Sequence, residues 1–76
     1  MNRSIDLSVQ RSIWRVRRRR ERLDALLQRT ATGWELSFHH NMKLLVSRTY
    51  STERGARAEA RKQRQELERA GWTQHW

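Results

Sequence analysis

Residues 8–30 read SVQRSIWRVRRRRERLDALLQRT, and the interpretation of this segment determines the fold class. Its apolar residues recur at steps of three, four or seven, which places them on one side of an α-helix: Val9, Ile13, Val16, Leu23 and Leu27. Ser8 precedes the first of them and has the side chain of a helix N-cap. The spacing predicts an amphipathic helix over residues 8–30, preceded by a flexible arm at residues 1–7.

The arginines of this segment follow the same period on the other side of the predicted helix: Arg11, Arg15, Arg18, Arg22 and Arg29. Trp14 lies beside this basic edge, and Arg20 interrupts the apolar stripe. Guanidinium groups pair bidentately with phosphate and carboxylate, and groups spaced along one face can follow successive phosphates of a nucleic acid. The residues expected to contact nucleic acid are Arg11, Arg15, Arg18, Arg19 and Arg22.

Residues 34–72 have a different pattern, which predicts a β-hairpin followed by a helix. From Trp34 to Phe38, and again from Leu44 to Tyr50, apolar and polar residues alternate as in half-buried strands. The turn between the strands is His40 to Lys43, with Asn41 suited to a left-handed backbone. A two-stranded ribbon needs a cover in water, and the last helix, about Thr52 to Ala70, is the expected cover.

The ends of this last helix carry the usual capping residues. Ser51 or Thr52 is the expected N-cap, Glu53 and Arg69 complement the helix dipole, and Gly71 is placed for a left-handed C-cap. The side predicted to pack on the hairpin contains Ala56, Ala60, Gln63, Leu67 and Ala70. The predicted fold is therefore α+β with element order α-β-β-α: helix 8–30, a hairpin-helix domain at 34–72, and a tail at 73–76.

Composition narrows the function to binding. The chain of 76 residues has a net charge of +9, from 17 Lys and Arg against 8 Asp and Glu, so nucleic acid, anionic membrane and acidic protein surfaces are the candidate partners. Few bulky apolar anchors accompany the charge, which disfavours the membrane. No Cys occurs, and no apolar run approaches the length of a membrane span, so we expect a cytoplasmic protein.

No catalytic or metal-binding constellation is visible in the sequence. His39 and His40 are adjacent, so on a strand they point to opposite faces and cannot chelate one ion together. Glu66 and Glu68 face different directions on a helix, and no Ser or Thr has a recognisable base and orienting acid. We therefore expect no enzyme activity, no metal and no cofactor.

Three resemblances bear on these predictions. Residues 34–72, with a W-x-L-x-F strand, Ala58-Glu59-Ala60 and a closing LERAGW, resemble small uncharacterised bacterial or phage open reading frames of hairpin-then-helix type. Their topology is also similar to AP2-like and integrase arm-type DNA-binding domains, which lay the sheet face away from the helix in the major groove. Here the outward positions carry almost no positive charge: Glu35, Ser37, His39, Leu45, Ser47 and Thr49. Residues 15–22, RVRRRRER, resemble the arginine-rich helices of phage antiterminators and viral RNA-binding peptides.

The sequence thus favours a nucleic-acid backbone-binding accessory or regulatory protein of bacterial, phage or plasmid origin, with weak sequence preference. The alternative is a protein-interaction module that docks its arginine face on an acidic partner protein. The apolar stripe is longer than a hairpin and one helix can cover, which predicts a homodimer or larger complex. Its interface would contain Val9, Ile13, Trp14, Val16, Leu23 and Leu27, and Arg20 would face Glu21 or Asp24 of a neighbouring copy.

Overall fold

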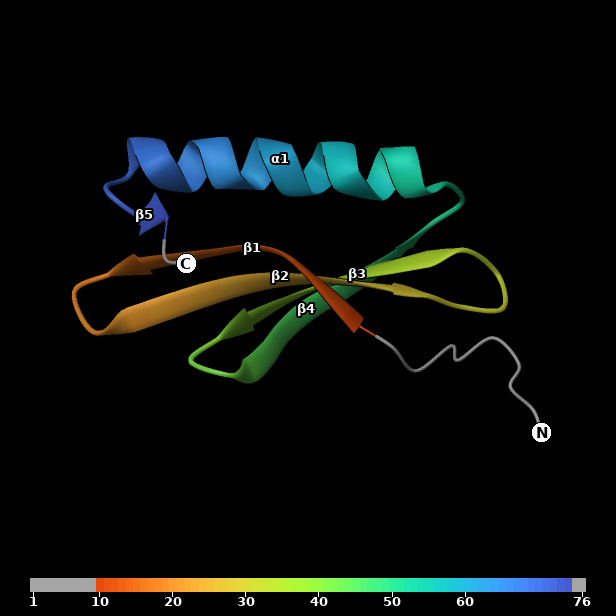
Figure 1. Cartoon of the computed structure of the whole chain (residues 1–76), viewed down its shortest axis with the longest axis horizontal. Coiled ribbons are helices and arrows are strands. Elements are labelled where there is room, and N and C mark those ends of the chain that lie inside the picture. Colours follow the sequence, from red (N-terminus) through yellow and green to blue (C-terminus); the bar gives the residue numbers. More distant parts are fainter. Residues whose placement is uncertain (1–9, 75–76) are drawn as a thin grey trace.

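The computed structural model describes residues 10–74 as an antiparallel sheet covered on one face by a helix (Figure 1). The elements in chain order are β1 Gln10–Arg18, β2 Glu21–Arg29, β3 Trp34–His40, β4 Lys43–Tyr50, α1 Glu53–Arg69 and β5 Thr73–Gln74. The five strands are arranged in the order β4-β3-β2-β1-β5, and neighbouring strands are antiparallel. The predicted α-β-β-α fold is therefore wrong, because the first half of the chain is a second hairpin.

The hairpin of β1 and β2 explains why residues 8–30 imitate a helical pattern. A two-residue turn at Arg19 and Arg20 places Val16 directly opposite Leu23. This facing pair, Val16 and Leu23, is seven residues apart in sequence, the same spacing that two residues on one side of a helix have. Each strand alternates by itself: Trp14 and Val16 are buried, and Arg15 between them points to the other face. The predicted cap Ser8 lies outside the described residues.

In the second half of the chain the predicted hairpin and last helix are present, but β4, predicted to be half-buried, is exposed at seven of its eight residues. Strands β3 and β4 form a hairpin with a turn at Asn41 and Met42, whose φ angles are 49° and 73°. At the start of α1 the Thr52 hydroxyl accepts a hydrogen bond of 3.0 Å from the Gly55 amide. At its end Gly71 has a φ of 100°, in the left-handed region that a C-cap glycine adopts.

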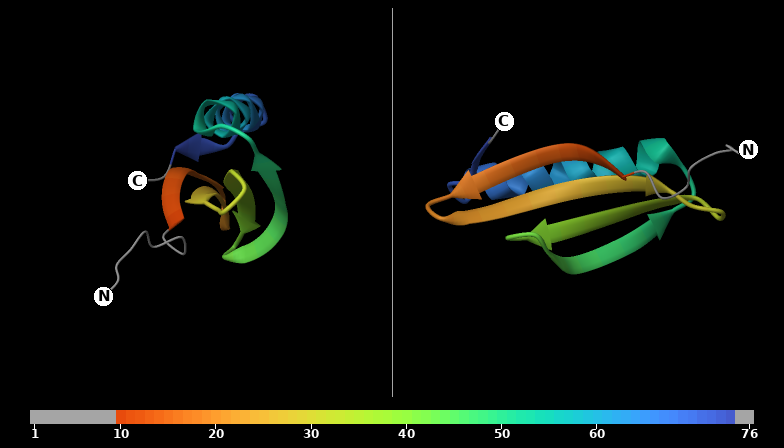
Figure 2. Two further views of the ribbon diagram at one scale, coloured as in Figure 1. Left: turned by 90° about the vertical axis from the view of Figure 1, so that its right-hand side faces the viewer. Right: turned by 60° about the horizontal axis from the view of Figure 1, so that its bottom comes forward.

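The core lies between α1 and one face of the sheet (Figure 2). Its buried residues are Trp14, Val16, Ala25, Leu27, Leu36, Ala56, Ala60 and Trp72. Ala56 and Ala60 are fully buried and allow the helix backbone to approach the sheet closely, whereas Ala70 is exposed. The indole nitrogen of Trp14 donates a hydrogen bond of 2.7 Å to the Ala60 carbonyl, which joins β1 to α1.

The two edges of the sheet differ. At one edge Thr73 and Gln74 pair with Arg17 and Val16, so part of the predicted tail at 73–76 is a short strand. The predicted arm at residues 1–7 lies outside the described residues. At the other edge β4 has seven exposed residues followed by the half-buried Tyr50. Within the described residues, β5 therefore covers part of the β1 edge of the sheet, whereas the β4 edge is unpaired.

Candidate nucleic-acid interface

The face of the sheet away from α1 carries several of the arginines. Register assigns the faces, because directly opposed residues of antiparallel strands point to the same side. Trp14 and Ala25 are opposed on the helix side, so their neighbours Arg15 and Asp24 are opposed on the open side. Two residues further along, Arg17 and Arg22 are opposed on that same open side.

The five predicted contact residues do not share one face. Arg15 and Arg22 lie on the open face, and Arg19 lies in the turn between β1 and β2. Arg18 belongs to the helix side, where its guanidinium lies 4.8 Å from the centroid of the Trp72 ring and donates a hydrogen bond of 3.1 Å to the Ala70 carbonyl. Arg11 is opposite Leu27, also on the helix side. The common face was a property of the predicted helix and is lost with it.

Two arginines that the helical interpretation left out join the group. Arg17 follows Arg15 on the open face, and Arg20 is the second residue of the turn. The alternation Trp14-Arg15-Val16-Arg17 is a strand pattern that could have revealed Arg17 in the sequence. Arg20 was assigned to an apolar seam, and as an exposed turn residue it faces no carboxylate of a neighbouring helix. We call Arg15, Arg17, Arg19, Arg20 and Arg22 the hairpin arginines.

One carboxylate partly neutralises the hairpin arginines. Asp24 is only 7% exposed, and its Oδ1 accepts a hydrogen bond of 3.2 Å from Arg15 Nε. Its Oδ2 lies 3.6 Å from Arg22 Nε, close enough for an ion pair but too far for a good hydrogen bond. A buried carboxylate requires such partners, so Asp24 fixes the positions of both arginines.

The remaining hairpin arginines lack partners among the described residues. The guanidinium groups of Arg17, Arg19 and Arg20 make no hydrogen bond or ion pair within residues 10–74. Arg17 is also directly opposite Arg22, and like charges at such positions destabilise a sheet. The arrangement concentrates positive charge beyond what the fold requires.

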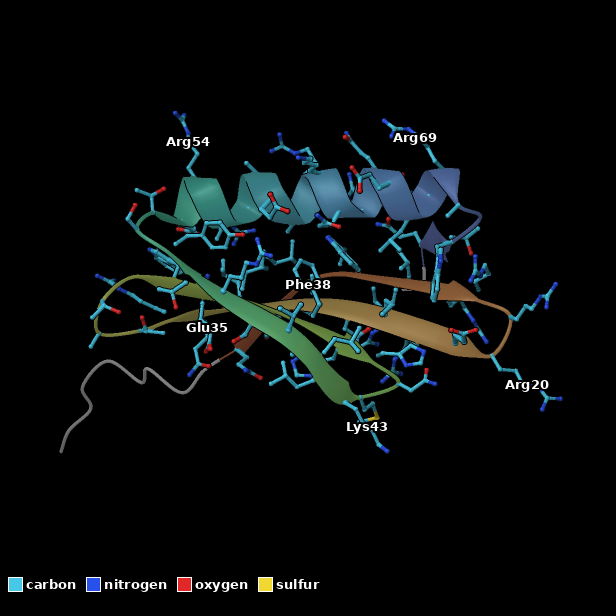
Figure 3. The ribbon with its side chains drawn as sticks, turned by 180° about the vertical axis from the view of Figure 1, so that it is seen from behind. Arg20, Glu35, Phe38, Lys43, Arg54 and Arg69 are labelled. Atoms are coloured by element: carbon cyan, nitrogen blue, oxygen red, sulfur yellow. The ribbon has the colours of Figure 1, made fainter. Side chains whose placement is uncertain are left out.

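The turn of β1 and β2 projects past the rest of the sheet and past the end of α1 (Figure 1). Arg20 lies at this tip and points away from the molecule, while Arg54 and Arg69 point outward from the far side of the helix (Figure 3). The turn is strained as well, because Arg19 has a φ of 58°, a conformation that β-turns normally assign to Gly or Asn. A projecting, strained and highly charged turn is a candidate contact site.

The residues predicted for a dimer interface lie elsewhere than expected. Trp14, Val16 and Leu27 are buried in the core of a single chain, so they form no exposed stripe. Ile13 and Leu23 pack against that core, and Val9 lies outside the described residues. The large exposed apolar side chains of the described region are on or next to β4 instead: Met42, Leu44, Leu45 and Val46.

The titratable residues of the described region form no metal site. Within residues 10–74 no group of three or more His, Asp or Glu side chains is positioned to hold a metal ion. His39 Nε2 is 3.2 Å from the Ser37 hydroxyl, and His40 Nε2 is 3.1 Å from Glu21 Oε1. No helix among these residues has the length and apolar character needed to cross a membrane.

Comparison with known proteins adds no functional assignment. No family model, curated protein or solved structure matches the chain.

Proposed function

We propose that this chain is a nucleic-acid backbone-binding module, an accessory or regulatory protein of bacterial, phage or plasmid origin that acts in the cytoplasm. The observation that carries the proposal is the group of hairpin arginines, among which the guanidinium groups of Arg17, Arg19 and Arg20 have no hydrogen-bond or ion-pair partner among the described residues. Guanidinium forks match the geometry of phosphate oxygens, and each contact releases counterions from the nucleic acid. Binding therefore weakens as the salt concentration rises.

The contacts are directed to the backbone and not to unpaired bases. Base stacking requires accessible aromatic rings. The aromatic residues of the described region belong to the helix side, where they form or flank the core: Trp14, Trp34, Phe38, Tyr50 and Trp72. The open face beside the arginines offers small exposed polar side chains such as Ser12 and Ser47. Weak sequence preference follows from this composition.

The test is a salt titration of binding to a duplex DNA of mixed sequence, measured by fluorescence anisotropy. If all five hairpin arginines contact phosphate, the slope of log K against log salt approaches about −4.5, since each contact to B-DNA contributes about −0.9. The double variant R19Q/R20Q should lower the magnitude of this slope by about 1.8.

The matched control is R54Q/R69Q, which removes the same charge from the helix surface that points away from the sheet (Figure 3). It should leave the slope nearly unchanged. Equal losses in the two double variants would mean that only net charge matters, and the hairpin arginines would not be the site. Absence of binding to DNA and RNA at low salt would overturn the proposed function.

A second candidate, a protein-interaction module, is favoured by β4. Its exposed residues Leu44, Leu45 and Val46 form an apolar segment on an unpaired strand edge, and sheets normally protect such edges. We propose that the occupant is a second copy of the chain, paired through antiparallel β4 strands. Centred on Val46, this pairing sets Lys43 opposite Thr49 and Leu44 opposite Arg48, so no like charges are opposed.

The dimer is tested by sedimentation equilibrium. The wild type should sediment as a dimer at about 100 μM, a concentration at which even an interface with micromolar Kd is largely occupied. The L45K variant should be a folded monomer, because two lysines would replace apolar side chains in the interface. A monomeric wild type would exclude this occupant and leave an acidic partner protein, docked on the hairpin arginines, as the remaining form of the second candidate.

A further inference from the structure

A cleft separates the two turns at the charged end of the sheet. Its volume is about 290 Å³, and residues of both hairpins line it: Arg17, Arg20, Glu21, Arg22, Asn41 and Met42. The β1–β2 turn and the β3–β4 turn thus form its opposite sides. This cleft is a more specific feature than the general basic character of the hairpin, because it brings residues of both hairpins together.

Three arginines are among the residues that line the cleft. Arg17 and Arg22 are directly opposed on the open face, where the Cβ atoms of such pairs lie about 5 Å apart. Arg20 lines the cleft from the turn, with its side chain directed outward in the structure (Figure 3). Arg17 and Arg20 make no ion pair with any described residue, whereas Arg22 is paired with Asp24 at 3.6 Å.

Asn41 holds one of these arginines in place. Its Oδ1 accepts a hydrogen bond of 2.9 Å from the backbone amide of Arg22, and its own amide donates one of 2.9 Å to the Arg22 carbonyl. These two bonds tie β2 to the neighbouring turn. Because Oδ1 is the acceptor, the side-chain NH₂ of Asn41 remains as a donor at the cleft.

Arg22 also has an unsatisfied donor. Its Nε atom is buried and makes no hydrogen bond, since Asp24 Oδ2 is 3.6 Å away. Leaving a buried donor without an acceptor costs free energy. The only carboxylate in the lining, Glu21, is already paired with His40 at 3.1 Å. The cleft therefore contains an excess of donors and of positive charge.

From this geometry we infer that the cleft is a discrete phosphate-binding site. A phosphate accepts hydrogen bonds on several oxygens and donates few, which complements three guanidiniums and an amide NH₂. Three cations against one carboxylate give the lining a net charge suited to a phosphate of one or two negative charges. The physiological source of that phosphate rests on the proposed function: it is an internal backbone phosphate or a terminal phosphate of a nucleic acid.

The first experiment uses inorganic phosphate as the probe. The full chain, labelled with ¹⁵N, is titrated with sodium phosphate at constant ionic strength, and the arginine Nε–H resonances are followed by NMR. The Arg17, Arg20 and Arg22 resonances should shift and saturate, whereas those of Arg54 and Arg69 should not. Unsaturated, equal shifts of all arginines, or none, would overturn the site.

Variants then test the assigned residues. R20Q, at an exposed turn position, should weaken phosphate binding about tenfold, the usual effect of losing one charged hydrogen bond. R54Q is the control and should change it less than twofold. N41G preserves the positive φ of the turn but removes the acceptor that fixes Arg22, and it should also weaken phosphate binding. Equal affinities in all three variants would contradict the inference.

Oligonucleotides distinguish the two sources. Duplexes with and without a 5′-phosphate are compared in the anisotropy assay. Tighter binding of the phosphorylated duplex, lost in R20Q, assigns the cleft to a terminal phosphate, and equal binding of both, weakened by R20Q, assigns it to the backbone. DNA binding without saturable phosphate binding overturns the site but keeps the proposed function. Saturable phosphate binding without nucleic-acid binding keeps the site but overturns the proposed function.

Discussion

The β1–β2 and β3–β4 hairpins have the same construction but different roles. Each has a two-residue turn at the same end of the sheet, with a positive φ at Arg19 in one and at Asn41 and Met42 in the other. In the first hairpin one face is buried against α1, and the charges gather on the other face and in the turn. In the second hairpin the outer strand β4 is exposed along nearly its whole length. Position within the sheet, and not local sequence, makes this difference.

This difference between the hairpins distinguishes the side chains that stabilise the fold from those that are available for binding. Core residues of β1 face α1, while the side chains between them face solvent and carry charge, so one strand supplies both properties. The apolar residues Leu44, Leu45 and Val46 of β4 contribute little to the core because their side chains stay largely exposed. Two groups of exposed side chains are therefore the candidates for external contacts. One is the unpartnered charged side chains of β1–β2, and the other is the apolar side chains of β4.

The largest effect that can test this comparison is the loss of the Trp14 side chain. Trp14 is 1% exposed and hydrogen-bonded to α1, so W14A should destabilise the fold by about 3–5 kcal/mol, enough to unfold so small a domain. Phe38 is only partly buried, so F38A should lower the free energy of unfolding by less than W14A does, but still substantially. Urea denaturation followed by circular dichroism measures both.

The contrast within this experiment is V46A on β4, at a side chain that is 44% exposed. It should change the free energy of unfolding of the monomer by less than about 1 kcal/mol. A loss in V46A as large as that in W14A would show that β4 belongs to a buried core, for example within an obligate dimer, and the contrast between the hairpins would not hold.

The two hairpins also differ in how far their structure is predictable from the sequence. The second hairpin and α1 follow from local signals: alternation from Trp34, the left-handed Asn41, the Thr52 cap and Gly71. The first hairpin lacks such signals, because its turn contains two arginines where Gly or Asn is usual. Without a turn signal, the cross-strand spacing of Val16 and Leu23 is indistinguishable from a helical heptad. The error concerned the position of a reversal, and with it the burial of Trp14, which the helical interpretation placed beside the basic edge.

The candidate site is predictable only in part for the same reason. Charge composition identifies the arginine-rich segment, and Arg15, Arg19 and Arg22 remain in the site. Their partner Asp24 and the cleft shared with Asn41 depend on contacts between strands, which a helical interpretation cannot supply. A site built across two hairpins becomes visible only when the pairing register is known.

The next effect compares one buried and one half-buried carboxylate, Asp24 and Glu35. D24N keeps the side-chain shape but removes the charge that Arg15 and Arg22 share, and it should lower the free energy of unfolding by about 1–3 kcal/mol. E35Q, on the second hairpin, loosens only an exposed 3.0 Å hydrogen bond from Ser47 and should cost less than about 0.5 kcal/mol. Thermal unfolding of the two variants measures the difference.

D24N has a second, opposite consequence. It removes the negative charge beside Arg15 and Arg22, so the folded variant should bind duplex DNA more tightly than the wild type at equal salt, while E35Q should bind nearly like the wild type. Binding that falls in D24N, measured under conditions where circular dichroism shows it folded, would mean that Asp24 holds the arginines in the binding geometry and that order outweighs charge.

The smallest effect compares the two turns directly. Arg19 and Met42 both have a positive φ, at 58° and 73°, which costs an ordinary side chain about 1 kcal/mol and a glycine almost nothing. R19G and M42G should therefore each stabilise the fold, by about 0.5–1 kcal/mol.

Their effects on binding should differ, because R19G removes an unpartnered guanidinium from the projecting turn while M42G removes only an apolar side chain. R19G should weaken duplex DNA binding about tenfold and reduce the salt slope by about 0.9, and M42G should change binding less than twofold. Chemical denaturation and anisotropy on the same samples provide the two measurements. If R19G were stabilising without any loss of affinity, the strain at Arg19 would have no role in binding, and the two turns would be equivalent.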